Sequence, residues 1–182
     1  MFTALGSFFG ASKRRAFLVL ALLAALNVWL FHAFGVTPGT FTSVSFLEVG
    51  QGDASLIELG DEVQILIDGG PPNGKLLAEL GDILSPYDRT IELVVLTHPE
   101  LDHYGGLIAL LERYEVGALV DTGVTKDVDA YETLIHAIEE HGIPRIVVRA
   151  GDRIRYGTHM LSVLSPNDAW AKAKETNDTS MV

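Results

Sequence analysis

The hydrophobic pattern of the chain changes its period partway along, and this change constrains the fold more than any other feature. Three short runs rich in β-branched and aliphatic residues, at 44–49, 54–59 and 63–67, come first and are separated by glycine-containing turns. This spacing predicts a series of antiparallel hairpins. From Leu76 to Leu84 the apolar residues recur at helical spacing, and strand-like and helical runs then alternate. We therefore expect an α/β (α+β) fold, with a mixed sheet and helices packed on its outer face.

Two strand–helix pairs follow the first helical pattern. The run 91–97 (IELVVLT) is the most apolar strand candidate, and a helical face at 107–114 comes after it. A short strand and loop at 117–123 precede a third helical face at 131–138, and 143–148 is another strand. The runs DRIRY and THMLSVL predict a hairpin. In such sheets the loops at the C-terminal ends of strands commonly carry the site.

The composition excludes several classes of protein and site. The chain has no cysteine, so it has no disulfide, no Cys-ligated zinc site and no thiol nucleophile. Hydrophobic residues make up 48% of the chain and charged residues 20%, a composition that builds a core and excludes a disordered chain. The 182 residues suffice for one domain with its own core.

The N-terminal part of the sequence predicts a membrane anchor. Lys13, Arg14 and Arg15 precede 19 mostly apolar residues, 16–34. At about 1.5 Å per residue this stretch is long enough to span a bilayer core of roughly 30 Å. The bases before it predict a cytoplasmic segment at 1–15 and a chain that continues on the extracytoplasmic side of the cell membrane.

A cleaved signal peptide is the alternative, although Ala33-Phe34-Gly35 is a poor cleavage site. On either interpretation the rest of the chain is exported. A short linker is expected at 35–43, because Pro and Gly interrupt it, and the domain begins at 44.

The exported part is strongly acidic. The first 35 residues hold three of the 13 Lys and Arg residues and no acid, so the other residues set ten bases against 24 acids, a formal charge of −14. Such a surface repels phosphate backbones unless local bases or bound cations intervene. This charge argues against loose nucleic-acid binding and leaves a metal site acting on a phosphodiester open.

Four side chains that can bind metal follow the apolar strand directly, in VVLTHPELDHYGG. A segment of six residues, 98–103, contains His98, Glu100, Asp102 and His103. Imidazole and carboxylate together suit divalent ions such as Zn²⁺ or Mn²⁺. The alternative is that Asp102 only caps the next helix and that the histidines are ordinary loop residues.

Two glycines follow the cluster. Gly105 and Gly106 remove side chains at the expected helix start, so we expect the backbone there to be open to a substrate and its N–H groups to be available to an anion.

The sequence around the cluster resembles that of a known family. THPELDHYGG looks like the H-x-[HDE]-x-D-H signature of the metallo-β-lactamase fold superfamily. Together with FLEVGQGDASLIEL, ILIDGGP, GDILSPYDRTIELVVLTHPELDHYGGL and NDTSMV, it is similar to the extracellular hydrolase domain of the ComEC competence-protein family. The resemblance runs from about residue 44 to the end of the chain. It implies the N-terminal portion of an αββα sandwich, a site for two divalent metal ions, and hydrolysis, with degradation of single-stranded DNA as the family's suspected activity.

The resemblance also implies roles for the cluster. His98 and Glu100 match ligands of the first metal, while Asp102 and His103 match ligands of the second. Asp102 is also the expected catalytic residue, orienting the attacking water. Glu100 stands where most of the superfamily has His, and an acidic ligand favours Mn²⁺ over Zn²⁺.

Further residues match family motifs outside the cluster. Asp68 in LIDGG is expected to orient a metal-binding histidine, with an ordinary Asp-Gly turn as the alternative. Asp53 in GQGD has the same two interpretations. Asn177 and Ser180 match the N-D-x-S motif as structural or pocket-edge groups, and Asp121 could line the pocket.

Two departures from the family bear on function. The later Asp and His ligands of the superfamily have no counterpart before Val182, so we expect the hydrolase domain (44–182) to be incomplete. ComEC proteins also have a large polytopic channel, whereas one membrane segment is expected here. The sequence thus leaves three readings: a phosphodiester hydrolase acting on nucleic acid; a hydrolase of another ester, thioester or lactam, with a small-molecule substrate; or an inactive domain that serves as a binding module.

Overall fold

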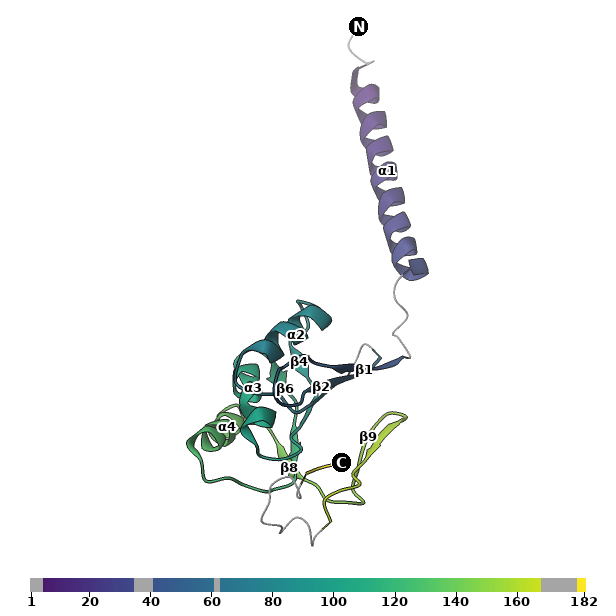
Figure 1. The fold of residues 1–182 in the computed structure, drawn as a ribbon. Coiled ribbons are helices and arrows are strands. Elements are labelled where there is room, and N and C mark those ends of the chain that lie inside the picture. Colours follow the sequence, from purple (N-terminus) through teal and green to yellow (C-terminus); the bar gives the residue numbers. More distant parts are fainter. Residues whose placement is uncertain (1–4, 35–40, 61–62, 168–179) are drawn as a thin grey trace. The chain divides into compact units, whose positions relative to one another are not determined.

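The structure is a computed structural model that describes residues 5–34, 41–60, 63–167 and 180–182 (Figure 1). The chain divides into two compact units, Met1–Gly39 and Thr40–Val182.

The first unit contains one long helix, α1 (Leu5–Phe34). Between residues 13 and 30 its side chains are exposed, large apolar ones such as Phe17 and Leu22 among them. Within the described ranges, none of the helices combines the length and the hydropathy that a membrane-spanning segment requires. The anchor at 16–34 stays a prediction, and most of the linker expected at 35–43 lies outside the described residues.

The second unit contains a six-stranded mixed sheet, in the order β1-β2-β3-β5-β7-β8. The first three strands are antiparallel neighbours, while β3, β5, β7 and β8 are parallel. This arrangement confirms the expected hairpins followed by strand–helix alternation. The strands are β1 (Thr42–Phe46), β2 (Ser55–Leu59), β3 (Val63–Ile67), β5 (Leu93–Val95), β7 (Leu119–Asp121) and β8 (Arg145–Val147).

Three helices cover one face of the sheet and bury the larger core. They are α2 (Lys75–Ile83), α3 (Leu101–Leu111) and α4 (Asp129–Glu140) (Figure 1). Fully buried leucines such as Leu80 and Leu110 pack against strand residues such as Leu56, and this apolar burial stabilises the layer. Tyr104 of α3 meets Tyr131 of α4 edge-on, with ring centroids 5.4 Å apart.

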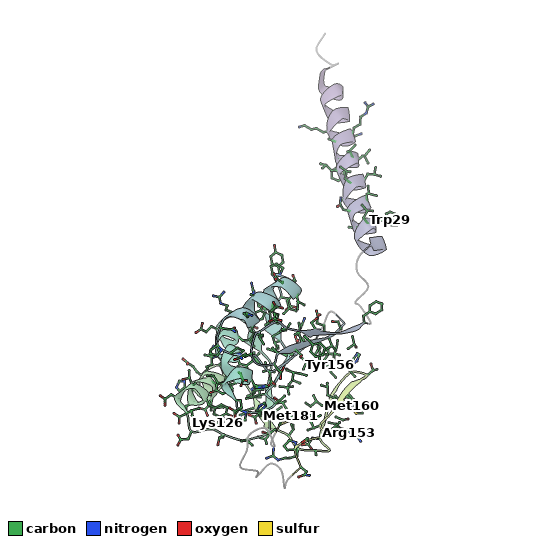
Figure 2. The ribbon with its side chains drawn as sticks, viewed as in Figure 1. Trp29, Lys126, Arg153, Tyr156, Met160 and Met181 are labelled. Atoms are coloured by element: carbon green, nitrogen blue, oxygen red, sulfur yellow. The ribbon has the colours of Figure 1, made fainter. Side chains whose placement is uncertain are left out.

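A hairpin packs on the opposite face. Its strands are β9 (Arg153–Tyr156) and β10 (His159–Ser162), which pair antiparallel as expected (Figure 2). Ile154 and Leu161 pack there against a second cluster that includes Val120 and Val163. The sheet therefore has a helical layer on one side and a hairpin on the other, a mixed α/β fold consistent with part of a metallo-β-lactamase sandwich.

Two expected strands have different limits in the structure. The strand expected at 44–49 ends at Phe46, and Leu47 and Val49 are instead buried in the loop that follows. The strand expected at 91–97 is divided at Glu92, whose carboxylate accepts a hydrogen bond from the Gln64 backbone N–H (2.7 Å). The residues before it form β4 (Thr90–Ile91), which pairs with β6 (Glu115–Val116) in a small separate sheet.

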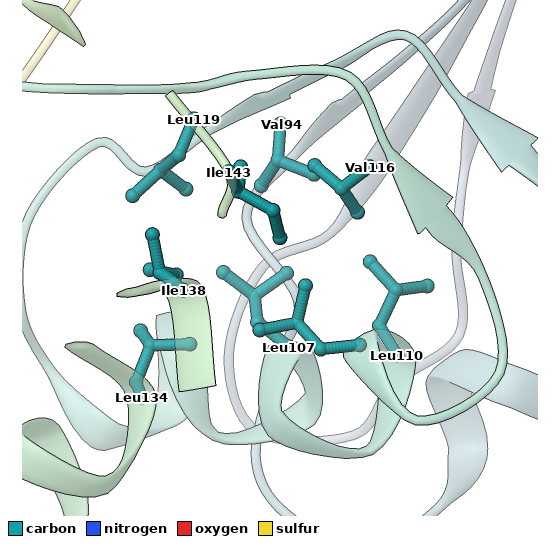
Figure 3. Close-up of a pocket in the computed structure, with 9 residues that line it drawn as sticks. Val94, Leu107, Leu110, Val116, Leu119, Leu134, Ile138 and Ile143 are labelled. Carbon is teal, nitrogen blue, oxygen red and sulfur yellow. The ribbon is translucent and has the colours of Figure 1, made fainter. Parts of the chain in front are cut away.

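A small apolar pocket lies between the sheet and helices α3 and α4 (Figure 3). Its lining includes Val94 and Leu119 from strands, Leu107 from α3, and Leu134 and Ile138 from α4. Among the described residues only apolar side chains line it, so it belongs to the core.

Glycines let α3 approach the turn after β3 closely. The Gly69 N–H donates to the His103 carbonyl oxygen (2.6 Å), and the Gly106 N–H donates to the Gly70 carbonyl oxygen (2.9 Å). A Cβ added at Gly106 would collide with the Gly69 carbonyl oxygen, and one at Gly105 would collide with Pro72. The expectation that these glycines open the backbone to a substrate is wrong, because both are buried against this turn.

This packing predicts a large stability difference between two glycine substitutions. We expect Gly106→Ala to lower the free energy of unfolding by about 3 kcal/mol, because the collision is with backbone and cannot be relieved by a rotamer change. Gly81→Ala in α2 is the matched control, since an added Cβ there meets nothing within 4 Å and should stabilise the helix by roughly 0.5–1 kcal/mol. Denaturant unfolding measures both, and equal effects would contradict the packing argument.

Candidate functional site

The candidate site lies at the C-terminal edge of the parallel strands. Thr97 and His98 follow β5, Asp68 follows β3, and Asp121 ends β7. Because parallel strands end at the same edge, residues far apart in the sequence meet there. Helix α3 begins just after the loop, with Glu100 as its N-cap, so the interpretation of Asp102 as the cap is wrong.

Asp68 connects the neighbouring strands. Its side chain is 3% exposed, and its carboxylate accepts hydrogen bonds from the Thr97 backbone N–H (2.8 Å), the Thr97 hydroxyl (2.7 Å) and His103 Nδ1 (2.8 Å). Its φ of 58° is the one positive value at a non-glycine position among the described residues. Such conformations cost energy and are found at functional sites, where the surrounding bonds hold them. The expected contact between Asp68 and a histidine of the cluster is present.

These hydrogen bonds determine the tautomers of both histidines. The Thr97 hydroxyl has one hydrogen, which it donates to Asp68, so its oxygen accepts from His98 Nδ1 (2.9 Å). His103 Nδ1 likewise donates to Asp68. Neither Nε2 atom has a hydrogen-bond partner in the described part of the chain. Both Nε2 lone pairs are therefore available, on rings whose centroids lie 4.0 Å apart.

The two histidines have opposite pKa shifts. Burial lowers the pKa of His98 below 6.5, and the neighbouring His103 lowers it further. The hydrogen bond to Asp68 raises the pKa of His103 above 6.5 and outweighs burial. His98 is therefore neutral, the form that binds metal, over a wider pH range than His103.

The two carboxylates of the cluster are arranged differently from the histidines. The Glu100 carboxylate forms an ion pair with Lys126 (2.6 Å), and Asp102 is exposed in the first turn of α3. Among the described residues no group of three or more His, Cys, Asp or Glu side chains is arranged to hold a metal ion. The structure thus brings the two histidines and Asp68 together, whereas the ligand roles of Glu100 and Asp102 stay predictions.

The other expected site residues lie around this edge. Asp53 is exposed; its carbonyl oxygen accepts from the Gly70 N–H (3.0 Å), and its negative charge contributes to the raised pKa of His103. Ser180 is half-buried, and the next residue, Met181, donates its N–H to the Thr97 carbonyl oxygen (3.0 Å). Asn177 lies outside the described residues.

Three residues that the sequence did not point to shape this edge. Thr97 completes the hydrogen-bond chain, Lys126 pairs with Glu100, and Arg145 binds Asp121 (2.6 Å). Asp121 is thus buried in an ion pair. Only Thr97 carries a sequence signal, since it stands at the end of the strand directly before His98.

Comparison with known proteins identifies the fold of this region. Residues 47–126 match the family model described as the metallo-beta-lactamase superfamily. This part of the chain is therefore similar to the metallo-β-lactamase superfamily, in agreement with the mixed α/β fold described above. The search of curated proteins found no match.

Solved structures give partial similarities. The rubredoxin oxygen:oxidoreductase of Desulfovibrio gigas is 24% identical over 70% of this chain and 30% of its own, with a TM-score of 0.47. MEM-A1, a subclass B3 metallo-β-lactamase from a soil metagenome library, is 16% identical over 69% of this chain and 50% of its own, with a TM-score of 0.49. BJP-1, a subclass B3 metallo-β-lactamase of Bradyrhizobium japonicum, is 20% identical over 69% and 50%, with a TM-score of 0.46. The chain thus spans 30 to 50% of the length of these structures.

The Asp68 contacts predict a coupled change in pKa and stability. In Asp68→Asn we expect the pKa of His103 to fall, because the amide cannot stabilise the protonated ring as the carboxylate does. We also expect a loss of about 2 kcal/mol of stability, because the donors on Thr97 and His103 face an amide. Because the folded pKa of His103 is raised, its stabilising contribution is present below pH 6.5 and fades as the pH rises through the raised pKa.

Proton NMR titration of the histidine Cε1 signals and denaturant unfolding measure these effects. Asp121→Asn is the matched control, since it removes another buried carboxylate at this sheet edge, one paired with Arg145. It should lower stability and leave the pKa of His103 unchanged. A His103 pKa that is the same in Asp68→Asn and the wild type would contradict the role given to Asp68.

Proposed function

We propose that the chain is a membrane-anchored, exported, metal-dependent hydrolase of ComEC-like metallo-β-lactamase type that cleaves phosphodiesters, with single-stranded DNA as the substrate. The observation that carries this proposal is the hydrogen-bond chain from Asp68, which gives His98 and His103 the same tautomer and leaves both Nε2 atoms available. Support also comes from the similarity of residues 47–126 to the superfamily, whose members are usually metal-dependent hydrolases.

The donor chemistry of this edge fits divalent cations. Two neutral imidazoles held by hydrogen bonds at Nδ1 are typical of Zn²⁺ or Mn²⁺ ligands. In the proposed centre His98 and Glu100 hold one ion, while Asp102 and His103 hold a second. Bound there, the ions would supply Lewis acidity and lower the pKa of a water molecule.

The chain's own residues have separate roles in this proposal. Asp68 orients both imidazole rings: it accepts a hydrogen bond from His103 Nδ1 directly, and it reaches His98 through the Thr97 hydroxyl. Asp102, exposed at the start of α3, accepts the proton of the attacking water and orients it. We further propose that the apolar stretch 16–34 anchors the chain and that the domain acts on the extracytoplasmic side of the cell membrane, because bases precede this stretch.

Two observations favour other functions. The charge of −14 beyond residue 35 repels a polyanion, which favours an ester, thioester or lactam as the substrate. The lack, among the described residues, of three donors arranged to hold a metal favours a binding module without catalysis. The assays below distinguish both from the first proposal.

Metal binding by the full chain tests the proposed centre. We expect the wild type, kept in a non-ionic detergent, to bind Mn²⁺ or Zn²⁺ in isothermal titration calorimetry, and His98→Ala to lose at least tenfold in affinity because one of two imidazole donors is gone. His136→Ala is the matched control, since His136 is 79% exposed on α4 and pairs with Glu140. Equal affinity in the wild type and His98→Ala would remove the ligand assignment.

Activity assays then separate the substrates. With Mn²⁺ present, we expect the wild type to degrade a single-stranded oligonucleotide and Asp102→Asn to lose this activity at least a hundredfold, as for a general base. Hydrolysis of a thioester or a β-lactam without cleavage of the oligonucleotide would select the alternative enzyme. Metal binding with no hydrolysis of any of them would favour the binding module.

A further inference from the structure

Lys126 contacts the candidate site directly. Its ammonium group lies 2.6 Å from Glu100 Oε2, and the two side chains are 30% and 34% exposed. Lys126 comes from the loop between β7 and α4, whereas Glu100 begins α3. The fold therefore places a lysine against one of the two carboxylates of the cluster.

Two hydrogen bonds hold the loop at the residues just before Lys126. On the β7 side, Asp121 accepts the Gly123 N–H (2.7 Å). From α4, the Tyr131 hydroxyl donates to the carbonyl oxygen of Val124, two residues before Lys126 (3.1 Å). Arg145 joins the two anchors, donating to Asp121 (2.6 Å) and to the Tyr131 hydroxyl (3.2 Å).

These anchors are buried, with Asp121 3% and Tyr131 2% exposed. A fixed loop path makes the ion pair less costly in side-chain entropy than a pair between two freely moving surface residues. Lys126 is thus presented to Glu100 by the fold, and the pair is more than a chance surface contact.

A carboxylate paired with a lysine is a weaker ligand for a second cation. A divalent ion at Glu100 would either displace the Lys126 ammonium, which costs the free energy of the ion pair, or bind beside it, which costs free energy through like-charge repulsion. The two histidines lack such a partner, since their Nδ1 atoms are bound to Thr97 and Asp68. The lysine therefore weakens metal binding at Glu100 and leaves the two histidines unaffected.

We propose that Lys126 is a selectivity-determining residue of the candidate metal centre: it competes with the divalent ion for Glu100 and so favours an ion held mainly by imidazole, such as Zn²⁺, over one that depends on carboxylate, such as Mn²⁺. This inference rests on the proposed function and adds a residue outside the four-residue cluster. It reverses the preference for Mn²⁺ that Glu100 by itself suggests.

Calorimetric titration of the full chain with Mn²⁺ and with Zn²⁺ tests this role. We expect Lys126→Met, which keeps the length and removes the charge, to tighten Mn²⁺ binding roughly tenfold, as expected for one unit charge near a divalent ion in a largely solvated site. Zn²⁺ binding should tighten less, and Lys126→Arg should behave as the wild type. Lys75→Met is the matched control, since Lys75 pairs with Glu48 (3.8 Å) on the surface and should alter neither affinity.

A double-mutant cycle separates competition from an indirect effect. In a Glu100→Gln background the Lys126→Met change should tighten Mn²⁺ binding clearly less than in the wild type, because the competition for the shared carboxylate is gone and only the repulsion between the ammonium group and the ion is removed. Circular dichroism checks that each variant is folded.

The outcomes distinguish this inference from the proposed function. Mn²⁺ binding that is unchanged or weaker in Lys126→Met, or tightened equally with Zn²⁺, would overturn the role of Lys126 and leave the metal centre standing. Failure of the wild type to bind either ion would overturn the proposed function, and the role of Lys126 with it.

Discussion

The carboxylate of Asp68 organises the edge of the sheet on which the candidate site depends. It lies at the end of β3 in a left-handed backbone conformation and accepts three hydrogen bonds from Thr97 and His103. These bonds join two parallel strands to the start of α3. Because a buried carboxylate is costly unless its oxygens are satisfied, the arrangement is stable only as a unit. The orientation of both histidines follows from it, since His98 reaches the same carboxylate through Thr97.

Close packing of backbone sets where α3 begins. Gly69 and Gly106 allow the helix and the turn after β3 to share hydrogen bonds at distances that a Cβ would prevent. The first turn of the helix therefore carries His103, while His98 lies in the short loop between β5 and α3. Glycines next to a cluster of polar residues suggest access for a ligand. Here they instead allow the backbone of α3 to pack against the backbone of the turn after β3. This contact positions the site without taking part in its chemistry.

Charge divides the site into two parts. On one side, the imidazoles of His98 and His103 are held at Nδ1 and are available at Nε2. On the other, Glu100 is paired with Lys126, whose loop is anchored by the buried pair of Asp121 and Arg145. The ion pair is a property of the fold, and it offsets part of the acidic character that the sequence around Glu100 suggests. Selectivity at such a site depends on both parts.

The sequence by itself determined the strand and helix pattern and the position of the cluster after an apolar strand, because periodicity and turn residues act locally. For Asp68 it left two interpretations open, a partner of a histidine and an ordinary turn. Tertiary structure decided which of these residues meet. The division of the strand at Glu92, the packing role of Gly106 and the pairing of Lys126 with Glu100 depend on contacts between segments far apart in the chain. Local sequence patterns do not predict such contacts, because these contacts form only when the sheet brings the ends of its strands to one edge.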